Sequence, residues 1–158
     1  MEAVRTVAIA CDHAGLGMKR LLTAYLASKQ VAVTDFGTDS EQSCDYPGFA
    51  EKVAEAVVSG QVQRGVLVCG SGIGISIAAN KVPGIRCALC HDHYTAMMSR
   101  AHNDANVLAI GGRTTGNEVA FEILDTFLTT AFESAHPNHS RRIAQIAAIE
   151  AKYRQPKA

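Results

Sequence analysis

The chain has 158 residues, of which 47% are hydrophobic and 19% charged, and this composition fits a single globular domain over residues 1–158. Its 15 basic residues balance 15 acidic ones, so no overall field favours nucleic acid or an anionic membrane as a partner. No apolar stretch reaches membrane-spanning length and the first residues lack the apolar core of a signal peptide, so we expect a cytoplasmic protein.

Short apolar runs alternate with amphipathic stretches along the chain. Helical spacing of apolar residues predicts helices over residues 18–26, 47–58, 93–101 and 120–131, and a shorter one from the loop after Cys69 to about residue 81. A polar break at residues 136–138 precedes a last helix. The apolar runs between these stretches are typical of strands and cover residues 4–11, 31–36, 65–69, 85–90 and 106–110.

Five strands separated by helices predict an α/β fold. We expect a Rossmann-like, doubly wound, five-stranded parallel sheet in a three-layer αβα sandwich, followed by a C-terminal helix. Ligands of such sheets bind beyond the carboxyl ends of the strands.

Polar residues collect at those carboxyl ends. They are Asp12 and His13 after the first strand, Tyr46 after the second, Cys69 at the end of the third and Arg113 after the fifth. His102 and Asn103 instead precede the fifth strand, which puts them at the opposite edge of the sheet. A site that uses both groups needs a second subunit, and this indicates a dimer.

The loop at residues 69–74 reads Cys-Gly-Ser-Gly-Ile-Gly and lies at a predicted strand-to-helix turn. Glycines allow backbone N–H groups to converge on an anion. The loop lacks the Lys-Ser/Thr ending of a P-loop and the spacing of a dinucleotide fingerprint. A nucleotide or phosphate cradle, another anion hole and simple tight packing all fit the loop taken alone.

The chain has five cysteines and no secretion signal, which favours free thiols over a disulfide framework. Cys69 opens the glycine loop, where a thiol next to N–H donors forms thiolate more readily. Such a thiolate can remove a proton α to a carbonyl while the donors hold the enediolate. The competing interpretation is a small buried side chain that ends a strand.

Other motifs have plain structural interpretations. Residues 87–91 match a haem-attachment or half-zinc pattern, but a strand points positions i and i+3 to opposite faces and no second ligand pair follows. Arg141 and Arg142 form either a solvated pair or a phosphate clamp. Lone histidines such as His13 and His102 are more often structural than catalytic, although both have polar neighbours.

In these motifs the sequence resembles the ribose-5-phosphate isomerase B family, which also includes allose- and galactose-6-phosphate isomerases. The glycine loop followed by His-Asn-Asp-Ala-Asn is the most specific part of the resemblance. The matching segments are residues 8–15, 45–47, 65–74, 78–81, 102–106, 111–113 and 139–143.

The resemblance implies an aldose–ketose isomerase that interconverts ribose 5-phosphate and ribulose 5-phosphate without a metal or other cofactor. Cys69 would move the proton between C1 and C2, assisted by Ser71, and His102 with Asp12 would open the sugar ring. It also implies a homodimer with active sites at the subunit interface, or a dimer of such dimers. Substrate or phosphate contacts would come from His13, Tyr46, Gly70, Gly72, Gly74, Asn103, Arg113, Arg141 and Arg142.

Two positions refine the resemblance. One branch of the family has a glutamate base where this chain has Ile75, so the chain groups with the members that use a thiolate. The family also usually has an arginine where this chain has Asn138. Asparagine cannot replace a charge-assisted arginine fork, so Arg141, His136 or His139 compensates or phosphate is held more weakly.

Three other functions are alternatives to the isomerisation of ribose 5-phosphate. A six-carbon sugar-phosphate isomerase would use the same chemistry in a longer pocket. A nucleotide-binding regulatory module would use the glycine loop but would have no use for Cys69. A redox sensor would need a resolving cysteine near Cys69.

Overall fold

The computed structural model describes residues 3–154. Its sheet has five parallel strands in the order β2-β1-β3-β5-β4, which confirms the predicted doubly wound sheet. The strands are β1 (Thr6–Cys11), β2 (Ala32–Asp35), β3 (Arg64–Cys69), β4 (Cys87–Leu89) and β5 (Val107–Gly111).

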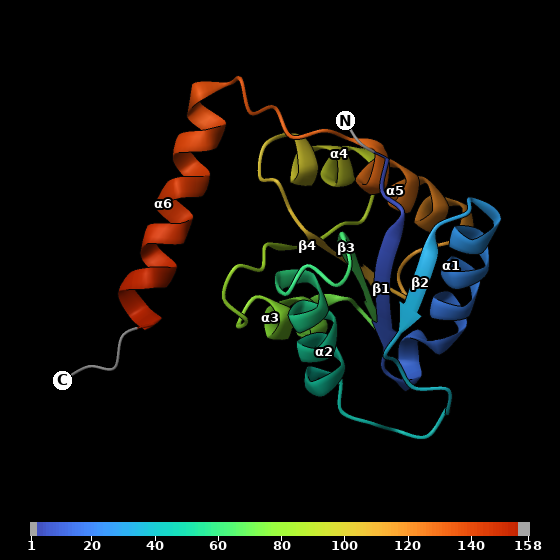
Figure 1. The fold of residues 1–158 in the computed structure, drawn as a ribbon. Coiled ribbons are helices and arrows are strands. Elements are labelled where there is room, and N and C mark those ends of the chain that lie inside the picture. The colour runs from blue at the N-terminus through green and yellow to red at the C-terminus, as the bar shows by residue number, and fades with distance from the viewer. Residues whose placement is uncertain (1–2, 155–158) are drawn as a thin grey trace.

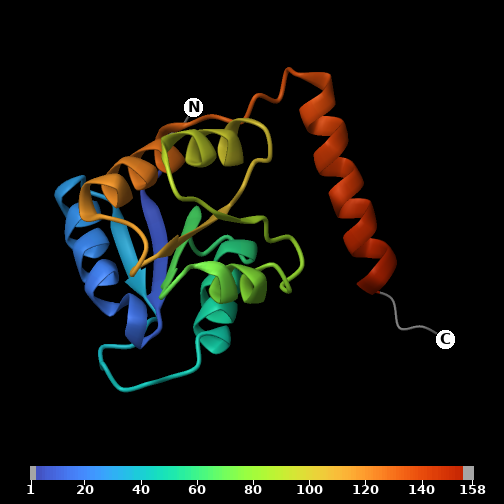
Figure 2. The same ribbon diagram turned by 180° about the vertical axis from the view of Figure 1, so that it is seen from behind.

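Helices cover both faces of the sheet, as Figures 1 and 2 show from opposite sides, and this confirms the three-layer sandwich. One face carries α1 (Leu16–Ser28), α4 (His93–Ala101) and α5 (Asn117–Thr129), and the other carries α2 (Pro47–Val58) and α3 (Ile73–Ala79). A short 3₁₀ turn, η1 (His13–Gly15), leads from β1 into α1.

Burial on both faces explains why the central strands are apolar throughout rather than alternating. In β1, Val7 and Ile9 pack into the core under α1 and α5, while Ala8 and Ala10 pack under α2. All four side chains are fully buried.

Most element boundaries differ from the sequence prediction by about one to three residues. β4 covers three residues, not the expected 85–90, because Ile85 closes a turn onto the Val82 carbonyl and the Asn106 side chain binds the Arg86 N–H. α3 ends at Ala79 rather than near residue 81. A break precedes the last helix as expected, but it ends at residue 136 rather than 138, since Pro137 is the first residue of that helix, a position that suits its fixed φ.

The last helix, α6 (Pro137–Arg154), stands apart from the sandwich in Figure 1, and it contacts the loop before β4 through Glu150, whose carboxylate accepts the Gly84 N–H at 3.0 and 3.1 Å. His139, near its start, is the one buried residue along its described length. Ile146, Ile149 and Tyr153 are exposed, so the apolar side chains of α6 have little cover within this chain.

A buried lysine holds the loop between β2 and α2. Lys19 of α1 is 1% exposed, and its Nζ lies 2.7 Å from Asp35 Oδ2 and 3.1 Å from Asp39 Oδ1. The same ammonium donates to the Thr38 carbonyl at 2.9 Å. Charge-assisted hydrogen bonds of this kind order the loop that leads to Tyr46. Within residues 3–154, no helix is both long and apolar enough to cross a bilayer.

Candidate active site

A pocket opens at the carboxyl ends of β1, β3 and β5, where the sequence predicted the ligand site. Its volume of about 630 Å³ is within the range of small-molecule sites. Eight of the predicted site residues line it together: Asp12, His13, Tyr46, Cys69, Gly70, Ser71, Gly74 and, from the loop after β5, Arg113. The predicted Gly72 is not among the lining residues.

Cys69 is the last residue of β3 and its sulfur lies under the glycine loop. The Gly72 N–H points to the Cys69 Sγ at 3.1 Å. Two backbone bonds fasten this loop to the segment after β5, one from Gly112 N–H to the Cys69 carbonyl at 2.8 Å and one from Arg113 N–H to the Gly70 carbonyl at 3.0 Å. These bonds fix the backbone of Arg113 relative to the backbone of Cys69.

Two glycines of the loop are required by packing. Gly72 has φ +77°, and a Cβ there would lie 2.5 Å from Leu89 Cδ1. A Cβ at Gly74 would lie 2.5 Å from Cζ of Tyr46, whose ring covers the loop. Tight packing, one of the interpretations open from the sequence, is thus present at these positions, and the Gly72 N–H is directed at the Cys69 sulfur.

Three of the other thiols are unsuited to act as bases at neutral pH. Burial raises the pKa of Cys11 to about 12 and the pKa of Cys90 to about 11. Burial also raises the pKa of Cys87 strongly. These three thiols therefore stay protonated at neutral pH.

His13 and Asp12 have defined orientations in the pocket. The Cys44 N–H donates to His13 Nδ1 at 3.2 Å, so in the neutral ring the proton is on Nε2. Asp12 is buried, and its Oδ1 accepts from the N–H groups of Ala14 and Gly15 at 2.9 and 3.0 Å. This carboxylate therefore caps the turn η1 in addition to facing the pocket.

His102 and Asn103 lie outside this pocket. His102 ends α4 and precedes β5, at the opposite end of that strand from Arg113, as chain order predicted. Arg141 and Arg142 are exposed on α6 and do not line the pocket either. The family resemblance assigns all of these residues to one active site, but within one chain some lie in the Cys69 pocket and the others lie outside it.

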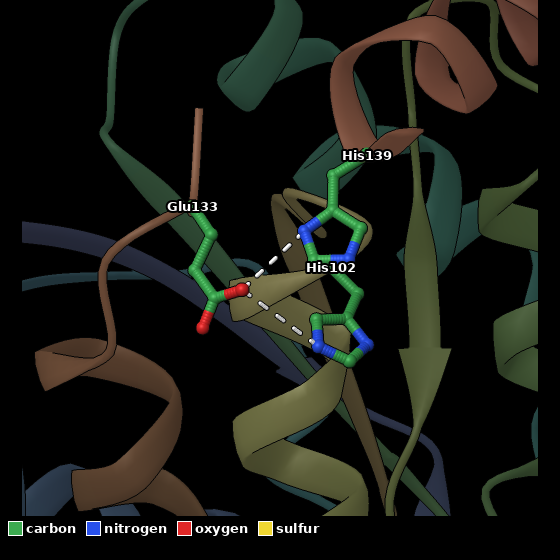
Figure 3. A group of neighbouring side chains, drawn as sticks. All are labelled: His102, Glu133 and His139. Atoms are coloured by element: carbon green, nitrogen blue, oxygen red, sulfur yellow. Dashed lines mark ion pairs between the residues drawn. The ribbon is translucent and has the colours of Figure 1, made fainter. Parts of the chain in front are cut away.

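His102 has neighbours that sequence reasoning did not connect with it. Its ring packs at a tilt of 35° against that of His139 with centroids 4.2 Å apart, and the Glu133 carboxylate faces both imidazoles (Figure 3). Burial and the nearby rings of His102 and His136 lower the pKa of His139. The sequence analysis did not single out Glu133, and it considered His139 only as a replacement for the family arginine. The three residues come from separate segments, and no spacing motif links them.

Comparison with known proteins gives one consistent result. Residues 7–146 match the family profile described as Ribose/Galactose Isomerase. Ribose-5-phosphate isomerase B of Escherichia coli is 46% identical over 93% of this chain and 97% of its own length. A D-erythrulose-4-phosphate isomerase of Pectobacterium atrosepticum is 44% identical over 81% of this chain and 85% of its own.

A solved structure agrees with these relatives. Ribose-5-phosphate isomerase B of Clostridium thermocellum superposes with a TM-score of 0.91 at 49% identity and covers 94% of this chain and 99% of its own. The fold, the chain length and the family profile therefore point to the same group of enzymes.

The contact between Gly74 and Tyr46 gives a test of the loop packing. Gly74→Ala should lower the free energy of unfolding by about 1–3 kcal/mol, because the new methyl overlaps the ring. Urea unfolding measures this. In a Tyr46→Ala background the loss should disappear, and an equal loss in both backgrounds would show that the ring is not what the methyl meets. Gly17→Ala is the control: Gly17 is exposed in α1 with open space around it, and alanine should stabilise by about 0.5–1 kcal/mol.

Proposed function

The chain belongs to the ribose/galactose isomerase family, and on this basis we propose that it interconverts D-ribose 5-phosphate and D-ribulose 5-phosphate. It is a sugar-phosphate isomerase of the ribose-5-phosphate isomerase B type. The proposed reaction proceeds by ring opening and a cis-enediolate, with the Cys69 thiolate as the base. The observation that carries this mechanism is the Cys69 sulfur under the Gly72 N–H, in a pocket shared with His13 and Arg113.

The proton transfer uses groups of the glycine loop. Cys69 takes the proton from C2 of the open-chain aldose, and the electron pair of that bond forms the C1=C2 double bond. Charge moves onto the oxygen at C1, where the N–H groups of Gly70 to Gly74 stabilise it. Ser71 assists the transfer of the hydroxyl proton from O2 to O1, and Cys69 returns its proton to C1 to give the ketose.

The substrate phosphate would bind at the rim of the same pocket. Arg113 is exposed there and can form two parallel hydrogen bonds to phosphate oxygens. His13 adds a donor from Nε2, because its Nδ1 already accepts the Cys44 N–H. Tyr46 covers the loop beside Gly74 and closes one side of the space left for the sugar.

A homodimer would complete the site. His102, which is proposed to open the ring with Asp12, lies at the far edge of the sheet from the pocket of its own chain. The long helix α6 has exposed apolar side chains, including Ile146 and Ile149, and carries the exposed Arg142 in its first half. A two-fold dimer can bring His102, Asn103 and Arg142 of one chain to the Cys69 pocket of the other.

The main alternative is a sugar-phosphate substrate with a different number of carbon atoms. The family profile includes galactose isomerases, and one relative acts on a four-carbon sugar phosphate. All of these substrates pass through the same enediolate, so the proton-transfer groups suit each of them. Allose 6-phosphate and erythrulose 4-phosphate therefore belong in the substrate panel. Membership of an isomerase family favours catalysis over a nucleotide-binding or redox-sensing role for this pocket.

Removal of the Cys69 thiol tests the proposed base. After EDTA treatment the wild type should isomerise ribose 5-phosphate, and Cys69→Ala should lose about 10²–10⁴-fold in kcat. Cys87→Ala, which removes a half-buried thiol on β4, should keep wild-type activity. Near-normal turnover by Cys69→Ala would refute the thiolate mechanism, and a wild type active only on another sugar phosphate would refute the choice of substrate.

Mixing two inactive variants tests the shared site. Cys69→Ala and His102→Gln should each be inactive, because each damages both sites of its own dimer. After joint refolding, random pairing should restore roughly a quarter of wild-type activity, since each mixed dimer has one intact site. Gel filtration supplies the oligomeric state. A monomeric enzyme that is active, or mixed dimers without activity, would contradict the shared site.

A further inference from the structure

His102, Glu133 and His139 form a compact set of metal-binding groups outside the Cys69 pocket (Figure 3). Glu133 Oε2 lies 3.4 Å from His139 Nδ1 and 3.9 Å from His102 Nε2. The three ligand atoms all lie within 4.8 Å of one another. They come from the end of α4, the segment after α5 and the start of α6, so the fold itself assembles the cluster.

A second observation indicates that this cluster is built for a ligand. The His139 side chain is 8% exposed, and its Nδ1 has no hydrogen-bond partner among residues 3–154 although it faces the Glu133 carboxylate. A buried ring nitrogen without a partner costs free energy unless something else satisfies it. In Figure 3 this nitrogen lies on the Glu133 side of its ring, and the His102 ring lies next to it.

We propose that His102, Glu133 and His139 bind a divalent transition-metal cation of the Zn²⁺ class. Two imidazole nitrogens and one carboxylate oxygen are a ligand set that Zn²⁺ accepts, with a fourth position open to water. Ligand atoms of a tetrahedral zinc site are about 3.3 Å apart, since each lies about 2.0–2.2 Å from the metal. The rings of His102 and His139 are tilted by 35° with centroids 4.2 Å apart, so His102 must turn about its side-chain bonds to direct Nε2 at a shared metal. The side chains of His102 and Glu133 are 42% and 54% exposed, which leaves room for that turn.

The surrounding charges set the expected strength of this site. His136 stacks on His139 at 4.3 Å, and Arg142 is near enough to act on the same ring, so the guanidinium charge of Arg142 opposes the metal. The Glu133 carboxylate is the one anionic member of the cluster and offsets this charge. Loss of Glu133 should therefore weaken binding as much as loss of an imidazole.

The bound cation would inhibit the enzyme, and this consequence rests on the proposed function. His102 is the proposed ring-opening residue, and a metal on its Nε2 occupies the lone pair that proton transfer needs. The reaction itself would need no metal, but a metal bound at this cluster would inhibit it. Chelation would raise the activity of the enzyme rather than abolish it.

A direct measurement of Co²⁺ binding tests the proposed metal site independently of enzyme activity. EDTA-treated, dialysed protein is titrated with Co²⁺ by calorimetry and visible absorption. The wild type should bind one Co²⁺ per chain with the spectrum of nitrogen and oxygen ligands. Glu133→Gln and His139→Gln should each weaken binding at least about tenfold. Glu133 is exposed, so that substitution leaves folding intact.

Two control variants make the result specific. His93 and Glu122 form an exposed pair with the same 3.4 Å separation but no second histidine in contact, so His93→Gln should leave binding unchanged. Cys69→Ala should also leave it unchanged. Absence of stoichiometric binding, full binding by Glu133→Gln, or a thiolate charge-transfer band that Cys69→Ala removes would each overturn the proposal.

Activity is measured separately with Zn²⁺. Inhibition of the wild type should follow the binding curve, and EDTA should reverse it. Inhibition should shift to higher Zn²⁺ in Glu133→Gln. Saturation of the site without inhibition would overturn the regulatory consequence. A wild type inactive on ribose 5-phosphate that still binds Co²⁺ through these residues would count against the proposed function and for the metal site.

Discussion

The geometry of the candidate active site depends on the close packing of one backbone loop. The loop after β3 is pressed between β5 and the Tyr46 ring, with room only for hydrogen at positions 72 and 74. That packing directs the Gly72 N–H onto the Cys69 sulfur and ties Arg113 to the same loop through backbone hydrogen bonds. Preorganised donors of this kind cost no reorganisation when charge develops. In the proposed mechanism the glycines therefore serve packing and catalysis at once.

A second constraint is the division of polar groups between the two edges of a parallel sheet. Cys69 and Arg113 lie at the carboxyl ends of β3 and β5, whereas His102 precedes β5. No local rearrangement within a sheet moves a residue from one edge to the other. The division, together with the exposed apolar side chains of α6, supports the proposal that two chains share each site. It also places His102 beside Glu133 and His139, where catalysis and metal binding would compete for one imidazole.

Much of the fold could be predicted from the sequence because the central strands are buried on both faces and read as unbroken apolar runs. The pocket could be predicted because Asp12, Cys69 and Arg113 each follow a strand. The short β4 and the start of α6 could not, since they depend on the Asn106 side chain and on a proline that begins a helix. Glu133 and His139 were also beyond prediction, because the path of the chain between α5 and α6 sets their distance from His102.

Solvent deuterium exchange tests the central claim most directly. Ribose 5-phosphate is incubated with the enzyme in deuterium oxide, and proton NMR follows C1 of the ribulose 5-phosphate formed. If Cys69 carries the proton, the wild type introduces deuterium at C1 while Cys69→Ala shows neither exchange nor isomerisation above background. Exchange by Cys69→Ala at the wild-type rate would contradict the account and assign the base to another residue.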